Sequence, residues 1–347
     1  MDGISIRQNL KAIARRSTIA ASAVSLALWS LSVLASAQTP ENPILLQLET
    51  KIPLGPVLGR IDHMAIDLKR QRLFIAELGN DSVGIVDIGA HKTIHTIDDL
   101  AEPQGIGFVP DTDTIYVANA NDGSVRLFRG TDYAAAGRID LGSDADNIRL
   151  DSNANRILVG YGDGSIAAVD VTQQKKFGDI PLPAHPEGFQ IGGEPKQVFV
   201  NLPGAHAVAV LDGASGTQKA KWPLHEDGNF PMALDTSTDR VLIVSRTPPK
   251  LIALAEEDGA VVGTADTCAD SDDLFIDAKR GRVYVSCGAG FIDVFQILGS
   301  SYQRVGHIAT TAGARTSLFV PELDRLFLAV RGSERQEAAI WVFRPAP

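Results

Sequence analysis

The sequence predicts an all-β domain built from seven repeats of four short strands. Three observations predict it: one strand-like motif recurs, its copies are evenly spaced, and short turn sequences separate the alternating segments between them. The seven anchor residues are 42, 42, 41, 43, 42 and 43 positions apart: Leu73, Ile115, Ile157, Val198, Val241, Val283 and Leu326. A period of about 40–45 residues with four strands per unit is typical of a β-propeller, so we predict a seven-bladed β-propeller.

Each unit supports four strands in the same order. In the first unit they span 64–67 (inner), 72–76 (the anchor strand), 82–87 (alternating) and 92–97 (a weaker outer strand). Tight turns rich in Gly, Asn and Asp, such as 79–81, separate the strands. Val, Ile and Phe dominate the anchor strands, as expected for strands that are buried on both faces.

The two ends of the repeat region predict how the ring closes. The seventh unit stops after its third strand, at 340–343, and residues 44–52 can supply the missing outer strand. Pairing the termini removes the exposed edges that an open stack of sheets would carry. We therefore predict one domain over residues 38–347, with its last blade closed by an N-terminal strand.

Residues 1–37 have the pattern of a cleaved signal peptide. Four basic residues begin the segment: Arg7, Lys11, Arg15 and Arg16. An apolar run at 19–34 follows, and Ala35-Ser36-Ala37 is a small-x-small cleavage site. A membrane anchor is the alternative, and the Arg15-Arg16 pair leaves general secretion and twin-arginine export both open. We expect a periplasmic or secreted protein.

The charge balance bears on the partners. Removal of the signal peptide takes away four basic residues and one acidic residue, which changes the net charge from −10 to −13. Such a surface repels a phosphate backbone, so we expect no nucleic-acid partner. No other stretch is long and apolar enough to span a bilayer. We expect a monomer that binds a small molecule, a peptide or a partner protein.

Two segments resemble a known repeat. Tyr116-Val117-Ala118-Asn119 followed by Ser124-Val125 is similar to the YVTN repeat, and Phe74-Ile75-Ala76-Glu77 with Ser82-Val83 is a second near match. Over residues 43–344 the chain resembles YncE-like, YVTN-type seven-bladed propellers. The resemblance implies this architecture and an exported binding protein. It assigns no catalytic residue, because the matched positions are structural.

The mouth of the central channel is where ligands usually bind in propellers. Four carboxylates stand 11 positions before the anchors of four units: Asp62, Asp146, Glu187 and Asp272. Carboxylates about 6 Å apart repel by about 3 kcal/mol at an effective dielectric near 20, so such a ring favours a bound cation. Oxygen ligands suit Ca²⁺ or Mg²⁺ better than zinc. A merely solvated mouth and an organic ligand without metal both stay open.

Six further residues are candidates for ligand binding on this face: Gln104, Asn119, Asn147, Tyr161, Arg246 and Arg331. Gln104 and Asn147 stand at the entry to the first strand of their units. The other four lie where a second strand leads into a third. The alternative is that the amides and glycines in these loops only form turns.

Catalysis has one candidate base. His63, next to Asp62, is a plausible general base. The alternative is that His63 is a structural histidine held by hydrogen bonds. In a hydrolase, His63 or Asp273 would move protons and Arg315 would orient an anionic substrate. Gly-x-Ser-x-Gly, P-loop and dinucleotide motifs are absent from the sequence.

The two cysteines predict a disulfide. Cys268 enters the sixth unit and Cys287 ends its second strand, so both reach the same face. An exported protein meets an oxidising compartment, and we predict that the bond closes a loop of 20 residues. Two buried free thiols are the alternative.

Two classes of function remain. The first is a non-catalytic exported propeller that binds its ligand at the acidic channel mouth. The second is a divalent-metal-dependent hydrolase, because Pro186-Glu187-Gly188 is similar to the Glu-Gly start of the first blade of gluconolactonase-like propellers, although it lies in the fourth unit here. Such a lactonase would hold Ca²⁺ or Mg²⁺ with the four mouth carboxylates.

Overall fold

The structure is a computed structural model that describes residues 44–193, 196–334 and 336–347. The predicted signal peptide at 1–37 lies outside the described residues. Within the described ranges, no helix has the length and apolar character needed to cross a lipid bilayer.

Each blade consists of four antiparallel strands. The innermost strands are β2 (Met64–Asp67), β6 (Pro103–Val109), β10 (Ala145–Asp151), β14 (Phe189–Gly192), β18 (Met232–Asp235), β22 (Ser271–Asp277) and β26 (Ser317–Val320). The second strands are β3 (Arg72–Glu77), β7 (Thr114–Asn119), β11 (Arg156–Tyr161), β15 (Gln197–Leu202), β19 (Arg240–Arg246), β23 (Arg282–Cys287) and β27 (Arg325–Val330).

The third strands are β4 (Ser82–Asp87), β8 (Ser124–Arg129), β12 (Ser165–Asp170), β16 (Ala207–Asp212), β20 (Pro249–Ala255), β24 (Phe291–Leu298) and β28 (Ala338–Pro345). The outer strands are β5 (Lys92–Ile97), β9 (Ala135–Asp140), β13 (Lys175–Pro181), β17 (Gln218–Pro223), β21 (Val261–Asp266), β25 (Ser301–Ala309) and β1 (Leu46–Gly55). The 3-10 turns are η1 (Leu78–Asn80), η2 (Pro110–Thr112), η3 (Ser152–Ala154) and η4 (Pro203–Ala205).

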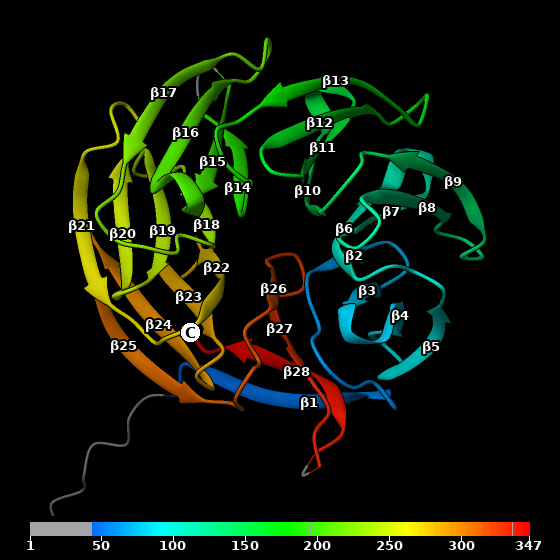
Figure 1. Cartoon of the computed structure of the whole chain (residues 1–347). Coiled ribbons are helices and arrows are strands. Elements are labelled where there is room, and N and C mark those ends of the chain that lie inside the picture. The colour runs from blue at the N-terminus through cyan, green and yellow to red at the C-terminus, as the bar shows by residue number, and fades with distance from the viewer. Residues whose placement is uncertain (1–43, 194–195, 335) are drawn as a thin grey trace, which may run out of the picture. The chain divides into compact units, whose positions relative to one another are not determined.

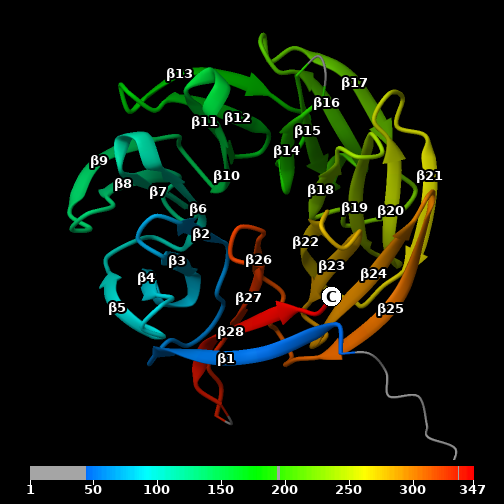
Figure 2. The same ribbon diagram turned by 180° about the vertical axis from the view of Figure 1, so that it is seen from behind.

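The seven sheets stand side by side in a ring with their innermost strands toward the axis (Figure 1). The view from behind shows the same order of blades around the centre (Figure 2). The predicted seven-bladed β-propeller is confirmed. The predicted ranges 64–67, 82–87 and 92–97 agree with the bounds of β2, β4 and β5.

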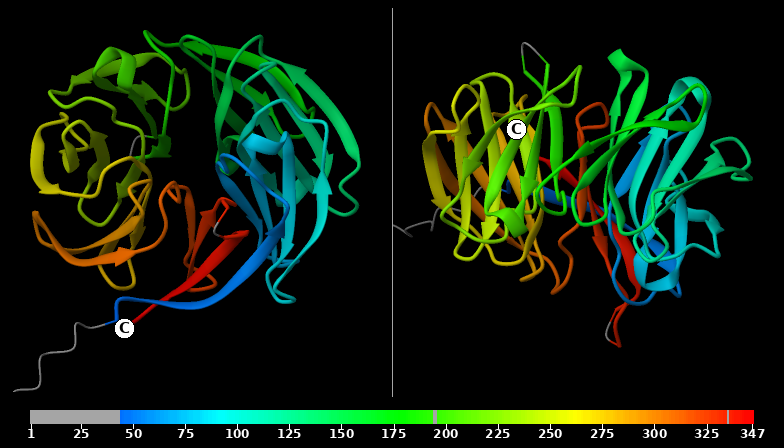
Figure 3. Two further views of the ribbon diagram at one scale, coloured as in Figure 1. Left: turned by 60° about the horizontal axis from the view of Figure 1, so that its bottom comes forward. Right: turned by 45° about the horizontal axis from the view of Figure 1, so that its top comes forward.

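The last blade joins both ends of the described chain. Its strand order is β1-β28-β27-β26, so the N-terminal strand β1 pairs with the C-terminal strand β28. The two run side by side in Figure 3. The predicted closure is confirmed, although β1 begins two residues later than expected and extends to Gly55. Ile52 lies opposite Ile340 in this pair, and both are fully buried.

The core lies between neighbouring sheets. All seven anchor residues are at most 1 % exposed. Large side chains from adjacent blades interdigitate there, as where Phe74 of blade 1 packs against Phe108 of blade 2 with ring centroids 5.5 Å apart. Burial on both faces explains why the anchor strands are continuously apolar rather than alternating.

Every blade carries a β-bulge between its third and outer strands. An unpaired residue is inserted in each outer strand: Ile94, Ala136, Phe177, Lys219, Val262, Val305 and Glu49. The closing strand β1 has a second one, Leu54. Bulges increase the local twist and spoil an edge for pairing with another chain. The ring thus has seven interrupted outer edges, and part of its exposed apolar surface lies at these bulges.

Charged residues at the turns between the innermost and second strands tie blades together on one face. Arg70 bonds Asp67 of its own turn at 2.7 Å and Asp113 of blade 2 at 2.7 Å. Arg280 contacts Asp277 at 2.9 Å and reaches Asp324 of blade 7 at 2.7 Å. These contacts link neighbouring blades directly, and they lie on the face opposite the entry to the innermost strands.

The predicted disulfide is confirmed. Cys268 and Cys287 are bonded, with Cα atoms 5.9 Å apart, and both are buried. The bond ties the loop entering blade 6 to the end of β23. That loop carries Asp270 to the channel mouth and leads directly into β22, which begins with Ser271 and Asp272.

The closing strand gives the first testable prediction. Ile52→Ala removes a fully buried side chain at the junction of the termini and should lower the free energy of unfolding by about 2–5 kcal/mol. Leu48→Ala in the same strand is the matched control, because Leu48 is 39 % exposed, and its effect should stay below about 1 kcal/mol. Urea denaturation measures both. Equal losses would show that β1 is not held by its buried face.

The disulfide gives the second prediction. Replacing Cys268 and Cys287 together by Ala should lower the free energy of unfolding by about 3 kcal/mol, because the unfolded chain regains the freedom of the closed loop. Urea denaturation of the oxidised protein and the double variant tests this. A double variant as stable as the oxidised protein would contradict it.

Candidate ligand site at the channel mouth

Ring closure brings the ends of the innermost strands together. The peptide nitrogen of His63 donates to the Gln104 carbonyl of blade 2 at 3.2 Å, and Thr316 Oγ1 donates to the Ile61 carbonyl at 3.1 Å, across the junction of blades 7 and 1. Glycine at this level lets neighbouring backbones approach: a Cβ on Gly105 would lie 2.1 Å from the Asp146 carbonyl oxygen. The loop residues before these strands therefore share one space.

The four carboxylates of the predicted ring lie close enough to act on one another. The negative charges of Asp272 and Asp146 both raise the pKa of Asp62. The same two charges raise the pKa of Glu187. Asp62 and Asp146 are 1 % and 5 % exposed, so their charges are removed from water. The repeat register thus places carboxylates from blades 1, 3, 4 and 6 around one axis.

Two arginines enclose the carboxylate of blade 6. Asp272 contacts Arg246 Nη2 through Oδ1 at 2.5 Å and Arg315 Nε through Oδ2 at 2.9 Å. Arg315 Nη1 also donates to Asp270 at 2.8 Å. The guanidinium of Arg246 lies 3.7 Å from the centroid of the Phe230 ring, which adds a cation–π contact. Blades 5, 6 and 7 meet in this network.

A second group of charges lies at blade 1. Arg60 Nη2 is 2.7 Å from Asp62 Oδ2. His63 lies between two carboxylates, 3.8 Å from Asp62 and 3.9 Å from Asp273. Burial raises the pKa of Asp62 to about 6, although His63 and Arg60 lower it. Burial likewise raises the pKa of Asp273 to about 6, against His63 and the Ser317 peptide N–H.

Blades 3 and 4 contribute a third group. His185 Nδ1 donates to the Gly162 carbonyl at 2.6 Å, and its Nε2 lies 3.8 Å from Asp146. Burial alone would lower the pKa of His185, but Asp146, the Gly162 carbonyl and Asp144 raise it to about 9. Burial and the Asp146 charge raise the pKa of Glu187 to about 7. A protonated His185 and a partly protonated Glu187 thus sit side by side near neutral pH.

A small cavity opens among these groups. Its volume is about 40 Å³, which is room for about three water-sized groups. Polar side chains of the network form one part of its wall: His63, Asn147, Arg149, Glu187, Gln190, Asp272 and Asp273. Apolar side chains form the other part: Phe230, Pro231, Met232, Leu274 and Phe275.

The predicted residues make up only part of the charged network at the mouth. Arg60, Asp144, His185 and Asp270 all stand 13 positions before their anchors, two residues before the predicted carboxylates. Each of these four residues forms an ion pair at the mouth. Extending the repeat alignment by two positions would have found them.

The six predicted ligand-binding residues divide into two groups. Asn147 lines the cavity, Arg246 binds Asp272, and Gln104 accepts the peptide N–H of His63. The side chains of the other three residues do not contact the cavity. Asn119 is fully buried and bonds to the backbone at Ala101, Val117 and Ser124. Tyr161 donates to Asp179 in the outer strand of blade 3, and Arg331 is exposed beside Gly313.

The predicted catalytic residues are all at the mouth. Asp273 Oδ2 accepts the Ser317 peptide N–H at 2.6 Å, so one of its oxygens is used to join blades 6 and 7. Arg315 contacts Asp270 and Asp272. Its charge is therefore largely balanced by the protein.

The four carboxylates at the mouth are not arranged to bind a metal ion directly. Over the described residues, no three His, Cys, Asp or Glu side chains converge as a metal cluster. Both oxygens of Asp272 face arginines, which would have to move before that carboxylate could bind Ca²⁺ or Mg²⁺. As arranged here, the four carboxylates do not form a ready ligand set.

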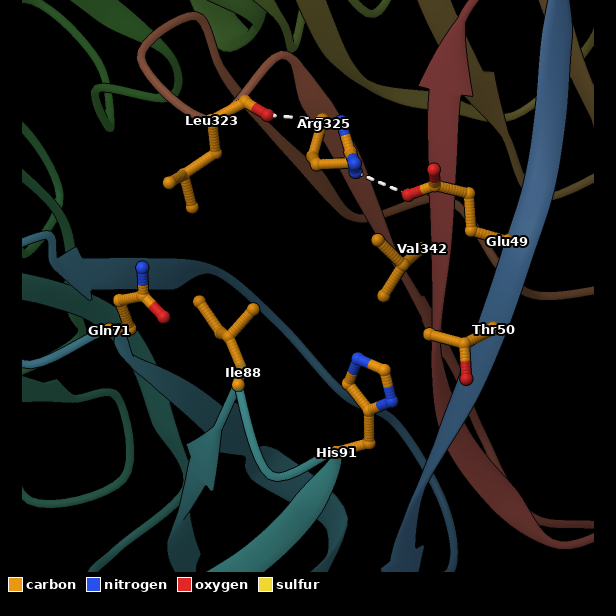
Figure 4. A pocket seen from close by; sticks show the side chains of 9 residues that line it. Glu49, Thr50, Gln71, Ile88, His91, Leu323, Arg325 and Val342 are labelled. Atoms are coloured by element: carbon orange, nitrogen blue, oxygen red, sulfur yellow. Dashed lines mark hydrogen bonds and ion pairs between the residues drawn. The ribbon is translucent and has the colours of Figure 1, made fainter.

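A larger cavity, of about 440 Å³, lies between blades 7 and 1 toward the opposite face. Figure 4 shows its lining: Ile88, Leu323 and Val342 surround the cavity from different elements, and His91 lies near Ile88 and Thr50. Glu49, the bulged residue of β1, pairs there with Arg325 and also with Arg344. A cavity of about 750 Å³ lies in the corresponding place between blades 4 and 5. Such gaps follow from blades diverging outward, so neither is our first candidate.

Comparisons with known proteins support the fold alone. No family model and no curated protein matches the sequence. A chain of Kuenenia stuttgartiensis hydrazine synthase is 16 % identical with a TM-score of 0.71, covering 83 % of this chain and 96 % of that chain. A chain of the mitotic checkpoint complex is 12 % identical, with a TM-score of 0.75 and coverage of 93 % and 99 %. The RRP9 WD40 repeats are 8 % identical, with a TM-score of 0.74 and coverage of 87 % and 98 %.

The raised pKa of Glu187 gives the third prediction. Because it rises from the ordinary 4.5 to about 7, the folded state holds a proton that the unfolded chain has already lost, and stability falls as the pH rises from about 4.5 to 7. Glu187→Gln removes this loss. We therefore compare the Tm of the variant minus the Tm of the wild type at two pH values. This difference should be about 2–4 °C larger at pH 8 than at pH 5.

Thermal denaturation at the two pH values measures the difference. Glu322→Gln, which removes an exposed carboxylate between β26 and β27 on the opposite face, controls for the loss of one negative charge. The same Tm difference for Glu187→Gln at both pH values would contradict the assignment of Glu187 to a buried, acidic mouth.

Proposed function

We propose that this protein is an exported, YncE-like binding protein that holds a small molecule, peptide or partner protein at its channel mouth. One observation supports this most: six of the seven blades send charged side chains to the channel mouth, where the carboxylates of Asp62, Asp146 and Asp272 are buried. Burying many carboxylates at one place opposes folding. Such an arrangement is expected where a ligand, rather than packing, determines the residues.

The other face provides the comparison. Its buried aspartates Asp67 and Asp277 each bond to an arginine that also reaches the next blade, so those charges have a structural role. At the mouth, Asp62 Oδ1 and Asp146 Oδ1 have no hydrogen-bond donor among the described residues. Part of the acceptor capacity of these buried carboxylates is thus unused by the protein, which favours a role in binding.

Export accords with the chemistry of the cysteines. A structural disulfide persists in an oxidising compartment such as the periplasm or the extracellular medium, and is rare in the cytosol. The signal peptide proposed for residues 1–37 would deliver the chain there. One of the structurally similar chains belongs to a complex, the mitotic checkpoint complex, which accords with a binding role for a propeller.

A thermal-shift screen tests the binding function. Wild-type protein is heated with separate panels of amines, carboxylates, sugars and dipeptides, because a ligand that binds only the folded state raises the Tm. We expect at least one class to raise it by about 2 °C or more, and the rise to disappear in Arg246→Ala, which removes the contacts to Asp272 and Phe230.

His91→Ala, in the cavity between blades 7 and 1, is the control and should keep the ligand-dependent rise. A rise that is lost in His91→Ala and kept in Arg246→Ala would move the function to the opposite face. If no class of ligand changes the Tm, the channel mouth is a solvated opening and the proposal fails.

The hydrolase alternative has one observation in its favour. Five buried acceptor oxygens at the mouth, on Asp62, Asp146, Asn147 and Asp272, lack hydrogen-bond donors among the described residues, and a divalent cation would satisfy some of them. The test is the effect of 1 mM CaCl₂ on the Tm, together with calcium-dependent hydrolysis of a lactone. Calcium-dependent stabilisation and turnover, both lost in Asp146→Asn, would replace the binding function by the hydrolase. Neither effect is expected.

A further inference from the structure

Arg149 carries a charge that the protein leaves without a carboxylate partner. It belongs to β10 and lines the small cavity at the mouth. Its Nη1 atom donates to the carbonyl of the neighbouring Ile148 at 2.8 Å, and its guanidinium lies 5.4 Å from the centroid of the Phe189 ring. Among the described residues it forms no ion pair. Most of the N–H donors of its guanidinium are therefore unused by the protein.

The other arginines and the carboxylates around this cavity are already engaged. Asp272 lies between Arg246 and Arg315 and pairs with both. Asp273 Oδ2 accepts the Ser317 peptide N–H at 2.6 Å. A buried charge is costly unless a partner of opposite sign contacts it. The unpaired arginine on the cavity wall thus indicates that an anion from outside the chain completes the site.

The size of the cavity limits the anion. About three water-sized groups fit into 40 Å³. A carboxylate group, with one carbon and two oxygens, matches this volume, whereas sulfate and phosphate would exceed it. Two carboxylate oxygens also match the fork of a guanidinium.

The surroundings of the cavity describe the rest of the ligand. Phe230 and Phe275 form part of the apolar wall and offer a surface to the carbon chain that follows the carboxylate. Asp62 and Asp146 are buried at the mouth outside the lining of this cavity. Their charges disfavour a second carboxylate on the same ligand.

We propose that the cavity at the channel mouth binds the carboxylate group of a small monocarboxylate, with its oxygens accepting N–H groups of Arg149 and its carbon chain packed on Phe230 and Phe275. This inference rests on the proposed binding function and names the chemistry of its ligand. The ligand supplies the negative charge that no ion pair of the protein gives to Arg149. A neutral amide of the same shape has no such charge, so it cannot replace the carboxylate.

The charges around Arg149 make this binding depend on pH. Burial raises the pKa of Glu187 to about 7 and that of Asp273 to about 6. Burial alone would lower the pKa of His63, but Asp62 and Asp273 raise it. Between pH 8 and pH 6 the site therefore gains protons, becomes less negative and should bind an anion more tightly. The charged groups that surround Arg149 on the cavity wall or next to it are His63, Asp146, His185, Glu187, Arg246, Asp272, Asp273 and Arg315.

The test is an NMR titration of the ¹⁵N-labelled protein with sodium formate and with formamide, its neutral isostere, at constant ionic strength. Binding is followed at the backbone amide signals of Asn147 and Gly188, which line the cavity. At pH 6 we expect saturable binding of formate in the millimolar range, because the probe has few atoms. Formamide should bind at least about tenfold more weakly, because it lacks the charge. At pH 8 formate should bind at least about threefold more weakly than at pH 6.

Two arginine variants locate the site. Arg149→Gln removes the charge and should weaken formate binding by at least about tenfold. Arg126→Gln is the matched control, because Arg126 is also a half-buried arginine without an ion pair among the described residues, but it lies in the third strand β8. This control should leave formate binding unchanged.

A third variant keeps the test decisive if Arg149→Gln does not fold. Glu187→Gln removes a negative charge from the cavity wall and should tighten formate binding at pH 8 by at least about threefold. Equal binding of formate and formamide, unchanged binding in Arg149→Gln, or no gain at pH 8 in Glu187→Gln would overturn the proposal. No formate binding while another class of ligand raises the Tm would overturn this inference and leave the binding function intact.

The same carboxylate can come from a free organic acid or from the C-terminus of a peptide. A further titration compares acetate with N-acetylglycine, which presents the carboxylate as a peptide chain does. Tighter binding of N-acetylglycine indicates a peptide as the source, and weaker binding indicates a free acid. Either result supports the carboxylate site at Arg149.

Discussion

Closure of seven sheets into one ring is the constraint on which the rest of the structure depends. Because each sheet has the same four strands in the same order, every innermost strand enters the ring from the same face. Loop residues that are about 42 positions apart in the sequence therefore meet at one axis. The apolar anchors between blades stabilise the ring. The polar residues at the axis are left free to differ from blade to blade.

The two faces of the ring use charge differently. On the face opposite the mouth, Arg70 and Arg280 each join two aspartates of neighbouring blades, which satisfies the buried carboxylates and links the sheets. At the mouth, Asp272 is paired with Arg246 and Arg315, whereas Asp62 and Asp146 keep a buried oxygen that has no donor among the described residues. Burial raises the pKa of Asp62 and Asp273 to about 6 and that of Glu187 to about 7, so the folded protein holds these carboxylates at a cost in stability.

The architecture could be predicted from the sequence because its signal repeats. Seven anchors at a steady period fix the number of blades, and the ranges of β2, β4 and β5 agree with the predicted ones. The seven bulges could not be predicted, because the inserted residues range from Lys219 to Phe177 and share no residue type. The extent of β1 was also missed, since it depends on pairing with β28, about 290 residues away.

The site was predicted in part for the same reason. Alignment of the repeats on their anchors identified the carboxylates. His185 and Arg60 were not predicted, because a single histidine or arginine in a loop has no sequence pattern of its own. Which oxygens keep a donor depends on side-chain geometry, and this cannot be read from spacing. Asn119 shows the converse: it ends β7 near the mouth, yet its side chain is bonded to the backbone of its own blade and of the loop before that blade.

The most direct measurement is a high-resolution crystal structure of the protein with a ligand that raises its Tm, inspected at the channel mouth. We predict that Asp62, Asp146, Glu187 and Asp272 face one axis, that Asp272 lies between Arg246 and Arg315, and that ligand density occupies the cavity beside Asn147. A spherical peak at about 2.3–2.6 Å with six or more oxygen ligands would instead establish a calcium site. Carboxylates turned away from the axis would contradict the account of the mouth altogether.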